Sequence, residues 1–479
     1  MGGEYDVVIV GAGLSGVGAA CHLAMKCPGK SYAVLEARGA IGGTWDLFRY
    51  PGIRSDSDMY TLGYAFRPWR DAKAIADGPA IKAYVEDTAR DYGVTPRIRF
   101  RHKVVRASWS SDDARWTVEA ETPEGPARFT SRFLMMCSGY YSYDQGYRPD
   151  FAQEADFGGR FVHPQFWPED LEYAGKRVVV IGSGATAVTL VPEMAKRAAH
   201  VTMLQRSPTY IVSRPSIDSI AEKLKRLLPP MLAYRLTRAK NVGLQMFFYR
   251  LARRRPAKVK EKMIGLVQGE LGPGYDVATH FTPTYDPWDQ RVCLVPDGDL
   301  FEAIRTGRAS VATGTIERFT ETGLRLTSGE ALPADIVVTA TGLKVNLMGG
   351  AGIFVDGVRQ DLSQALTYKA IMFSAVPNLA YVFGYTNASW TLKADLAADY
   401  VCRLINHMDL KGYATSMPVA DAKVKPEPFL TFTSGYVQRA LAALPRQGDR
   451  APWRLHQNYA LDLLSLRFGR IEDGTLRFA

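Results

Sequence analysis

The sequence contains two glycine-rich turns, each placed between a short β-branched run and a helical stretch. The first turn is GAGLSG, which follows the run Tyr5–Val10 and precedes an expected helix over Val17–Met25. In such a unit Gly11 allows a tight turn, Gly13 lets the backbone approach a pyrophosphate, and Gly16 lets helix and strand pack closely. Glu36 lies 20 residues after Gly16, where its carboxylate can accept hydrogen bonds from a ribose diol.

A second copy of the unit begins at Arg177. The strand Val178–Ile181 leads into a turn whose predicted cofactor contacts are Gly182, Ser183, Gly184, Ala185, Thr186 and Ala187. Its second strand, His200–Gln205, is followed by Arg206 and Ser207 in place of an acid. A carboxylate there would repel a 2′-phosphate, whereas a guanidinium pairs with it. The second site is therefore predicted to bind NADPH in preference to NADH.

Two dinucleotide sites, one with an acid and one with an arginine, predict a flavoprotein that takes hydride from NADPH, with FAD in the first site. Two later segments of the chain are expected to pack against the FAD site. The buried-strand run Asp335–Thr339 is followed by the turn 340–342, of a type that closes against FAD, and Phe133–Cys137 followed by 138–139 is an earlier counterpart.

The excess of positive charge is confined to one segment. The net charge is +10, and residues 218–262 contain 13 basic residues against three acids, so the remainder is neutral. This argues against a nucleic-acid partner. We expect basic side chains that cover apolar surface with their stems; peripheral contact of residues 218–262 with an anionic membrane is the alternative.

The five cysteines show neither a CxxC motif nor metal-ligand spacing, so no disulfide framework and no metal site are predicted. Acidic residues near the N-terminus do not suit an export signal, which predicts a cytoplasmic protein. A flavin disulfide reductase would need a CxxxxC just after the first motif, and none is present.

The segment between the two units carries a specific resemblance. FGGRFVHPQFWP matches the FxGxxxHxxxWP fingerprint of Baeyer-Villiger monooxygenases at Phe157, Gly159, His163, Trp167 and Pro168. Further stretches resemble the subgroup that contains the ethionamide-activating monooxygenase: residues 42–66, 181–192, 205–213, 286–301 and 384–396. In that family the fingerprint lies between the nucleotide domains, which implies a hinge role for His163 in place of a general-base role.

The resemblance also implies roles for individual residues. The FAD-lining positions would be Ser15, Thr44, Trp45, Asp46, Leu47 and the backbone of Val104. Asp56 matches the active-site aspartate, and Arg291 the arginine beside the flavin ring. Many relatives have a lysine before that arginine where this chain has Gln290, so NADPH selectivity would depend mainly on Arg206 and Ser207, and its strictness is left open.

The activity implied by the resemblance is oxygenation through a C4a-peroxyflavin. Ketones would become esters or lactones and sulfides would become sulfoxides, with O2 as co-substrate. Asn387 and Trp390 are expected in the pocket wall above the flavin, and Tyr140, Tyr141 and Tyr143 form a second candidate wall.

The predicted fold is α/β, with two Rossmann-like domains and a helical insertion. Residues 1–143 and 340–479 would form the FAD domain, residues 144–217 and 285–339 the NADP domain, and residues 218–284 the insertion, with helices broken at its prolines. Two alternatives remain: a flavin-containing monooxygenase restricted to sulfur or nitrogen, whose motif lacks Trp-Pro, and a membrane-surface or nucleic-acid binder using the basic insertion. The physiological substrate, regio- and enantioselectivity, and oligomeric state are left open.

Overall fold

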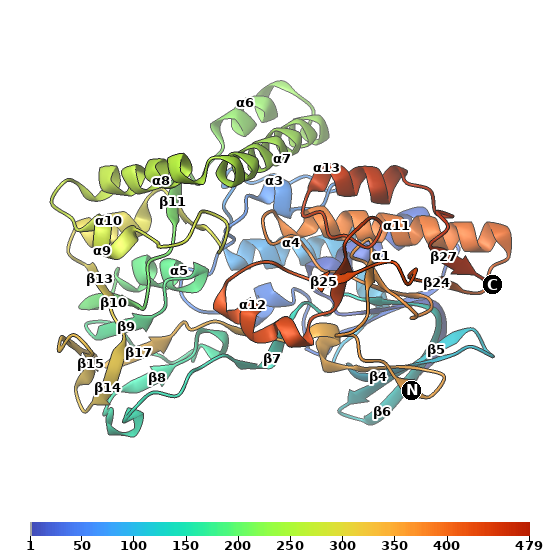
Figure 1. Cartoon of the computed structure of the whole chain (residues 1–479), viewed down its shortest axis with the longest axis horizontal. Helices are drawn as coiled ribbons and strands as arrows, with labels where there is room; N and C mark the ends of the chain where they lie inside the picture. Colours follow the sequence, from blue (N-terminus) through green and yellow to red (C-terminus); the bar gives the residue numbers. More distant parts are fainter. Residues whose placement is uncertain (1) are drawn as a thin grey trace.

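The computed structural model describes residues 2–479, with helices packed around two main sheets (Figure 1). The first sheet has nine strands in the order β20-β19-β4-β5-β6-β1-β2-β3, with β23 also paired to β6. Its strands are β1 (Gly3–Val10), β2 (Tyr32–Leu35), β3 (Ile98–Arg99), β4 (Lys103–Ser110), β5 (Arg115–Thr122), β6 (Gly125–Met136), β19 (Gly352–Val355), β20 (Val358–Arg359) and β23 (Leu379–Tyr381).

Both faces of β1 are buried, which explains its β-branched composition. Val7 and Ile9 point into a core shared with three helices, whereas Val8 and Val10 join a core on the other face. The three helices are α1 (Leu14–Lys26), α4 (Gly78–Asp91) and α11 (Trp390–Lys411). Strands β1 and β2 are parallel neighbours, so the loops that follow them lie together at the carboxyl ends of the strands. A nucleotide would bind at this end of the sheet.

The second sheet has five parallel strands in the order β13-β10-β9-β17-β8. They are β8 (Arg160–Val162), β9 (Arg177–Ile181), β10 (His200–Gln205), β13 (Ala309–Thr313) and β17 (Ile336–Thr339). Helices α5 (Ala185–Met194) and α10 (Asp299–Arg305) contribute to its core. The predicted α/β class with two Rossmann-like units is confirmed.

Two chain segments connect the sheets, and they pair with each other. β7 (Tyr141–Gly146) leads from the first sheet to the second, and β18 (Leu343–Val345) leads back. They form an antiparallel ribbon. A third small sheet, β14 (Ile316–Thr320), β15 (Gly323–Leu326) and β16 (Ala331–Pro333), precedes the return. The two expected domain boundaries, at residues 143–144 and 339–340, therefore lie in or next to this ribbon.

One sequence expectation is wrong. The sequence predicts that the turn after Thr339 closes against FAD, but β17 belongs to the second sheet, and a Cβ on Gly182 would lie 2.4 Å from the carbonyl oxygen of Ala340. The turn therefore closes against the second glycine turn. The first glycine turn is closed by Cys137, whose carbonyl oxygen would lie 2.6 Å from a Cβ on Gly11.

The segment between β11 (Ile211–Arg214) and β12 (Cys293–Pro296) is helical. It contains α6 (Ser219–Leu227), α7 (Pro230–Arg254), α8 (Pro256–Leu271) and α9 (Val277–Phe281). Prolines begin α7 and α8, because proline is tolerated in the first helical turn but not inside it. Within the part of the chain that the structure describes, no helix has both the length and the apolar character of a bilayer span.

The remaining elements surround the site. Two short helices follow β2, α2 (Thr44–Leu47) and α3 (Met59–Leu62), and the C-terminal region adds α12 (Gly435–Ala440) and α13 (Tyr459–Asp462). Short strand pairs complete the fold: β21 (Thr367–Tyr368) with β22 (Met372–Phe373), β24 (Ser416–Pro418) with β27 (Leu476–Phe478), and β25 (Pro426–Pro428) with β26 (Arg446–Gly448).

Candidate functional site

The first glycine turn has the features that a pyrophosphate and a ribose require. Gly13 is the N-cap of α1, and neither a capping side chain nor an acid occupies the first helical turn. The free amide groups and the helix dipole are therefore available to an anion. A Cβ on Gly16 would lie 1.8 Å from the carbonyl oxygen of Gly11, so only glycine fits there.

Glu36 is buried at the end of β2, and its two carboxylate oxygens accept from the backbone. Oε2 accepts from the amide of Ala12 at 2.6 Å, and Oε1 from the amide of Arg38 at 2.8 Å. Burial raises the pKa of Glu36 above its ordinary value, against the lowering effect of these hydrogen bonds. The carboxylate lies beside the glycine turn, as a ribose ligand would.

The residues expected to line FAD begin where α2 starts. Thr44 Oγ1 accepts from the phenol of Tyr141 at 2.6 Å, and Trp45 and Leu47 pack nearby. Asp46 is buried and paired with Arg38 at 2.6 Å and Lys82 at 2.8 Å. Burial alone would raise its pKa, but these hydrogen bonds hold the pKa of Asp46 below its ordinary value. Asp46 thus anchors the segment through ion pairs, a contact that the motif did not predict.

Two further expected FAD contacts, Val104 and Ser15, lie on different elements of the first sheet and its helix α1. Val104 is buried in β4, next to an irregularity in its pairing with β5. Ser15 Oγ accepts from Trp390 Nε1 at 2.7 Å, which joins the first turn to the start of α11. Trp390 is the first residue of that helix.

The second glycine turn is similar but more open. Gly184 is the N-cap of α5, again without a capping side chain, and a Cβ there would meet nothing within 4 Å. Ala187 occupies the third small position and is buried, whereas Ala185 and Thr186 stay accessible. Ser183 Oγ bonds Thr209 Oγ1 at 2.8 Å, and Cys293 Sγ donates to the Ser183 carbonyl at 3.8 Å.

The end of β10 is positively charged. Arg206 and Ser207 are exposed, and within residues 2–479 Arg206 forms no ion pair. Sequence reasoning missed a second arginine here: Arg439 of α12, whose guanidinium lies 3.4 Å from the ring centroid of Tyr147. Burial and the charge of Arg206 lower the pKa of Arg439. No motif marks Arg439, because its proximity depends on how the C-terminal region folds back.

The two predicted catalytic residues are brought together. Arg291 Nη1 lies 3.5 Å from Asp56 Oδ2, and both side chains are 38% exposed. The loop carrying Arg291 is held by Asp289, which pairs with Arg253 of α7 at 2.6 Å. The side chains of Tyr436 and Tyr140 and the carboxylate of Asp56 raise the pKa of Arg291, and this outweighs the lowering by its partial burial. The guanidinium therefore stays charged.

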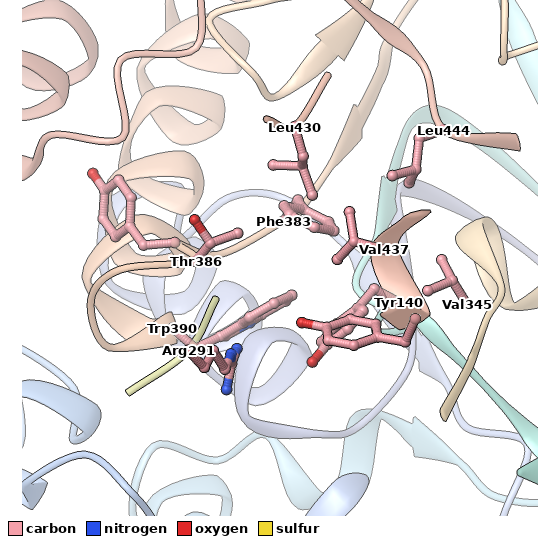
Figure 2. A pocket seen from close by; sticks show the side chains of 11 residues that line it. Tyr140, Arg291, Val345, Phe383, Thr386, Trp390, Leu430, Val437 and Leu444 are labelled. Atoms are coloured by element: carbon pink, nitrogen blue, oxygen red, sulfur yellow. The ribbon is translucent and has the colours of Figure 1, made fainter. Parts of the chain in front are cut away.

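Arg291 and Trp390 line one cavity with Tyr140 (Figure 2). The Tyr140 ring stacks on Trp390 at 5.2 Å between centroids, and Phe383 packs against both. Most of the other lining residues come from the C-terminal region: Tyr385, Thr386, Leu430, Tyr436, Val437 and Leu444, together with Val345. Sequence reasoning missed Tyr436, which lacks any motif.

The three tyrosines predicted as a second pocket wall do not lie together in one wall. Tyr140 lines the cavity, whereas Tyr141 and Tyr143 pack near Thr44, on the glycine-turn side. Asn387 is not in the cavity wall either. Its Nδ2 donates to the carbonyl oxygen of Gln457 at 2.9 Å, and its neighbour Thr386 takes the lining position.

The fingerprint segment lies beside the linker ribbon. A Cβ on Gly146, the last residue of β7, would lie 2.0 Å from His163 Cε1, so the imidazole occupies the space of that missing side chain. His163 Nδ1 accepts from the Gln165 amide at 3.2 Å, and burial lowers its pKa. The other fingerprint residues pack locally: Phe157 and Gly159 near β14 and β17, and Trp167 at the edge of the second core, followed by the half-buried Pro168.

Comparison with protein families places this site among flavoenzymes. Residues 73–228 match the flavin-binding monooxygenase-like family, and residues 9–77 match an NAD(P)-binding Rossmann-like domain. The chain is 57% identical over 480 residues to the FAD-containing monooxygenase EthA of Mycobacterium tuberculosis, covering 99% of this chain and 98% of that protein. The chain belongs to the FAD-containing monooxygenases. The expected FAD-dependent oxidoreductase is confirmed.

A second relative and two solved structures agree with this family. The chain is 49% identical to the probable FAD-binding monooxygenase AlmA of Acinetobacter baylyi, covering 99% of this chain and 96% of that protein. A steroid monooxygenase bound to NADP superposes with a TM-score of 0.76 at 23% identity, and a cyclohexanone monooxygenase with 0.74 at 19%, each covering 99% of both chains. The chain thus shares its fold with these two monooxygenases.

Proposed function

We propose that this monooxygenase converts ketones to esters or lactones and sulfides to sulfoxides, using NADPH and O2. The ketone reaction balances as ketone, O2, NADPH and a proton giving ester, water and NADP+. The observation that carries the proposal is the charged guanidinium of Arg291 in the wall of an otherwise aromatic and aliphatic cavity. Trp390 connects this cavity to the first glycine turn, and Cys293, two residues after Arg291, connects it to the second.

Bound FAD would accept hydride from NADPH and pass electrons to O2, which supplies the oxygen atom for transfer. The fit of the first turn supports FAD there, because uncapped amides, a buried acid and the absence of room for side chains suit a dinucleotide. The exposed guanidinium of Arg206 supports NADPH at the second turn, with Ser207 and Arg439 close by.

Arg291 has the properties needed to stabilise an oxyanion. Its charge is permanent, and its Nε is buried without a hydrogen-bond partner. A fixed donor in a site with little water stabilises the negative charge that develops on oxygen when a carbonyl is attacked. Asp56 pairs with the guanidinium at 3.5 Å and acts as a positioning residue. The same cavity, lined by aromatic rings, accepts thioethers.

His163 is proposed as a hinge residue that couples the two nucleotide units. Its ring packs against Gly146 of β7, and its backbone begins the segment Pro164–Phe166. A movement of the second unit would therefore be transmitted to the linker ribbon. We also infer a reducing, cytoplasmic environment, because all five cysteines are free and buried.

The decisive experiment uses Arg291→Ala with Arg253→Ala as a matched control. Arg253→Ala removes the ion pair that holds the loop but keeps the guanidinium of Arg291. We expect Arg291→Ala to retain FAD and its reduction by NADPH but to lose ester formation by about a hundredfold or more. Arg253→Ala should lose only a few-fold, about what a surface ion pair contributes.

The products decide between the reaction classes. A panel of linear, cyclic and aryl ketones and thioethers is supplied, and ester and sulfoxide are quantified against NADPH consumed. Sulfoxide without any ester would favour a monooxygenase restricted to sulfur and nitrogen. Unchanged ester yield from Arg291→Ala would remove the proposed mechanism.

A further inference from the structure

The inner face of helix α7 packs on residues 58–64, which include α3. Arg238 Nη1 donates to the carbonyl oxygens of Tyr60 at 2.8 Å and Gly63 at 2.7 Å. The Tyr234 phenol donates to the Tyr64 carbonyl oxygen at 3.0 Å, and Asn241 Nδ2 donates to Asp58 at 2.9 Å. The helix is therefore held rigidly along this side.

The opposite face of α7 is apolar although it is exposed. Five outward positions recur at intervals of three or four residues, so they form one stripe along the helix. They are Leu232, Leu236, Ala239, Gly243 and Phe247. Leu236 is 45% exposed and Phe247 is 58% exposed. We call these five residues the outer stripe. A helix whose inner face already packs on the protein has no folding reason for such a stripe.

The neighbouring helix α6 also exposes apolar side chains. It packs beside α7, and both stand at the upper edge of the molecule in Figure 1. Its exposed apolar residues are Ile220, 52% exposed, and Leu227, 79% exposed. The expectation that basic stems cover this apolar surface is therefore not met at these positions.

Exposed cations without an ion pair among residues 2–479 are concentrated on and next to these helices. Two of the segment's three acids are paired locally, Asp218 with Lys240 and Glu222 with Lys225. Across residues 2–479, eight exposed basic side chains of α6, α7, the α7–α8 junction and α8 form no ion pair: Lys223, Arg226, Arg235, Arg250, Arg254, Arg255, Lys258 and Lys262. This unpaired charge calls for an anionic partner.

We propose that α6 and α7 dock in the plane of an anionic lipid bilayer, with the outer stripe among the acyl chains and the neighbouring cations at the headgroups. Apolar residues flanked by Lys and Arg on one helix face are the pattern of interfacial helices. A cationic surface is also attracted to the negative potential of anionic lipids. The proposal does not depend on the reaction catalysed, because no residue of the site lies on this surface.

The test measures co-sedimentation of the FAD-loaded full chain with vesicles. Phosphatidylcholine vesicles are compared with vesicles that also contain phosphatidylglycerol. The test variant is Leu236→Ser with Phe247→Ser. The control is Val358→Ser with Leu410→Ser, which removes two more exposed apolar side chains (65% and 82% exposed) from β20 and α11.

We expect the unmodified protein and the control to bind anionic vesicles, and about 0.5 M NaCl to weaken that binding. The test variant should bind about tenfold more weakly, since it loses apolar contact with the acyl chains. FAD content and NADPH oxidation with a water-soluble substrate should be the same in all three proteins, which shows that each is folded.

Three outcomes would overturn the proposal. They are absence of binding to anionic vesicles, equal binding by the test variant and the control, and equal binding to neutral and anionic vesicles. Light scattering tests a fourth outcome. If the unmodified protein is a dimer and the Leu236→Ser/Phe247→Ser variant is a monomer, the stripe is a subunit interface and the proposal is wrong. Loss of ester formation in the proposed reaction is measured separately and leaves this result unaffected.

Discussion

The two glycine turns share a sequence pattern but differ in their surroundings. At the first, a Cβ on Gly13 would meet the Cα of Gly43 at 3.4 Å, Glu36 is buried, and Trp390 of the distant α11 bonds Ser15. At the second, a Cβ on Gly184 would meet nothing within 4 Å, and Arg206 is exposed and unpaired in residues 2–479. An enclosed site suits a nucleotide that stays bound through many turnovers, and an open site suits one that exchanges at each turnover.

The largest expected effect comes from the third small position of each turn. Gly16→Ala places a Cβ 1.8 Å from the Gly11 carbonyl oxygen, so the turn must open. We expect a loss of about 3 kcal/mol in the free energy of unfolding and loss of bound FAD. Denaturant unfolding and the flavin absorbance of the purified protein measure both effects.

The matched change at the second turn is Ala187→Gly. It removes a methyl group from a helix and should cost about 1 kcal/mol, with FAD retained. If both variants lost FAD equally, the two turns would not differ in the way described.

Much of this comparison was predictable from sequence, because each turn is a local pattern. The order of strand, turn and helix, the acid at Glu36 and the arginine at Arg206 are all fixed by short-range spacing. The return turn at Ala340 was assigned to the wrong site, since which sheet a short buried strand joins depends on long-range pairing. Tyr436 and Arg439 were missed for the same reason: they reach the site through the fold of the C-terminal region.

The next effect concerns the exposed cation of the second turn. Arg206→Ala should raise KM for NADPH by about tenfold to a hundredfold, because charge-assisted hydrogen bonds to a phosphate contribute about 1.5–3 kcal/mol. KM for NADH should hardly change, because NADH lacks the 2′-phosphate. Steady-state kinetics with both nucleotides measure the ratio. A parallel rise for both would mean that Arg206 does not select the phosphate.

A smaller effect is expected at Arg439 of α12, which lies close enough to Arg206 for the two charges to interact. Arg439→Ala should raise KM for NADPH about threefold to tenfold, because its guanidinium is stacked on the Tyr147 ring and only adds to the charge that Arg206 supplies. Arg439→Lys is the control that keeps the charge but changes the stacking on Tyr147. If alanine and lysine raise KM equally, stacking and not charge is the contribution of Arg439.

The buried acid of the first turn predicts a pH dependence that the second turn lacks. Burial raises the folded-state pKa of Glu36. In the apoprotein its contribution to stability therefore decreases as pH rises from the unfolded-state pKa through the folded-state pKa. FAD binding follows the opposite sign: as pH falls through the raised pKa, the protonated carboxyl loses acceptor capacity for the ribose and FAD dissociates more readily.

Glu36→Gln tests this directly. The variant should bind FAD about tenfold more weakly near neutral pH and should lose the pH dependence of FAD release. Fluorescence of released FAD between pH 5 and 8, at about constant ionic strength, measures both quantities. An unchanged pH profile in the variant would assign the dependence to another group.

The smallest expected effect concerns the closure of the first site by α11. Trp390→Phe keeps an aromatic ring to stack on Tyr140 but removes the 2.7 Å hydrogen bond from Nε1 to Ser15 Oγ. A neutral hydrogen bond contributes about 1 kcal/mol, so FAD should dissociate about fivefold faster. Trp109→Phe is the matched control, because it removes a similar bond from Nε1 to Ser111 Oγ at 3.2 Å, away from the glycine turns. Equal rates of FAD dissociation in the two variants would mean that α11 closes the first site by packing alone. The difference between the two turns would then come from their shape and not from this hydrogen bond.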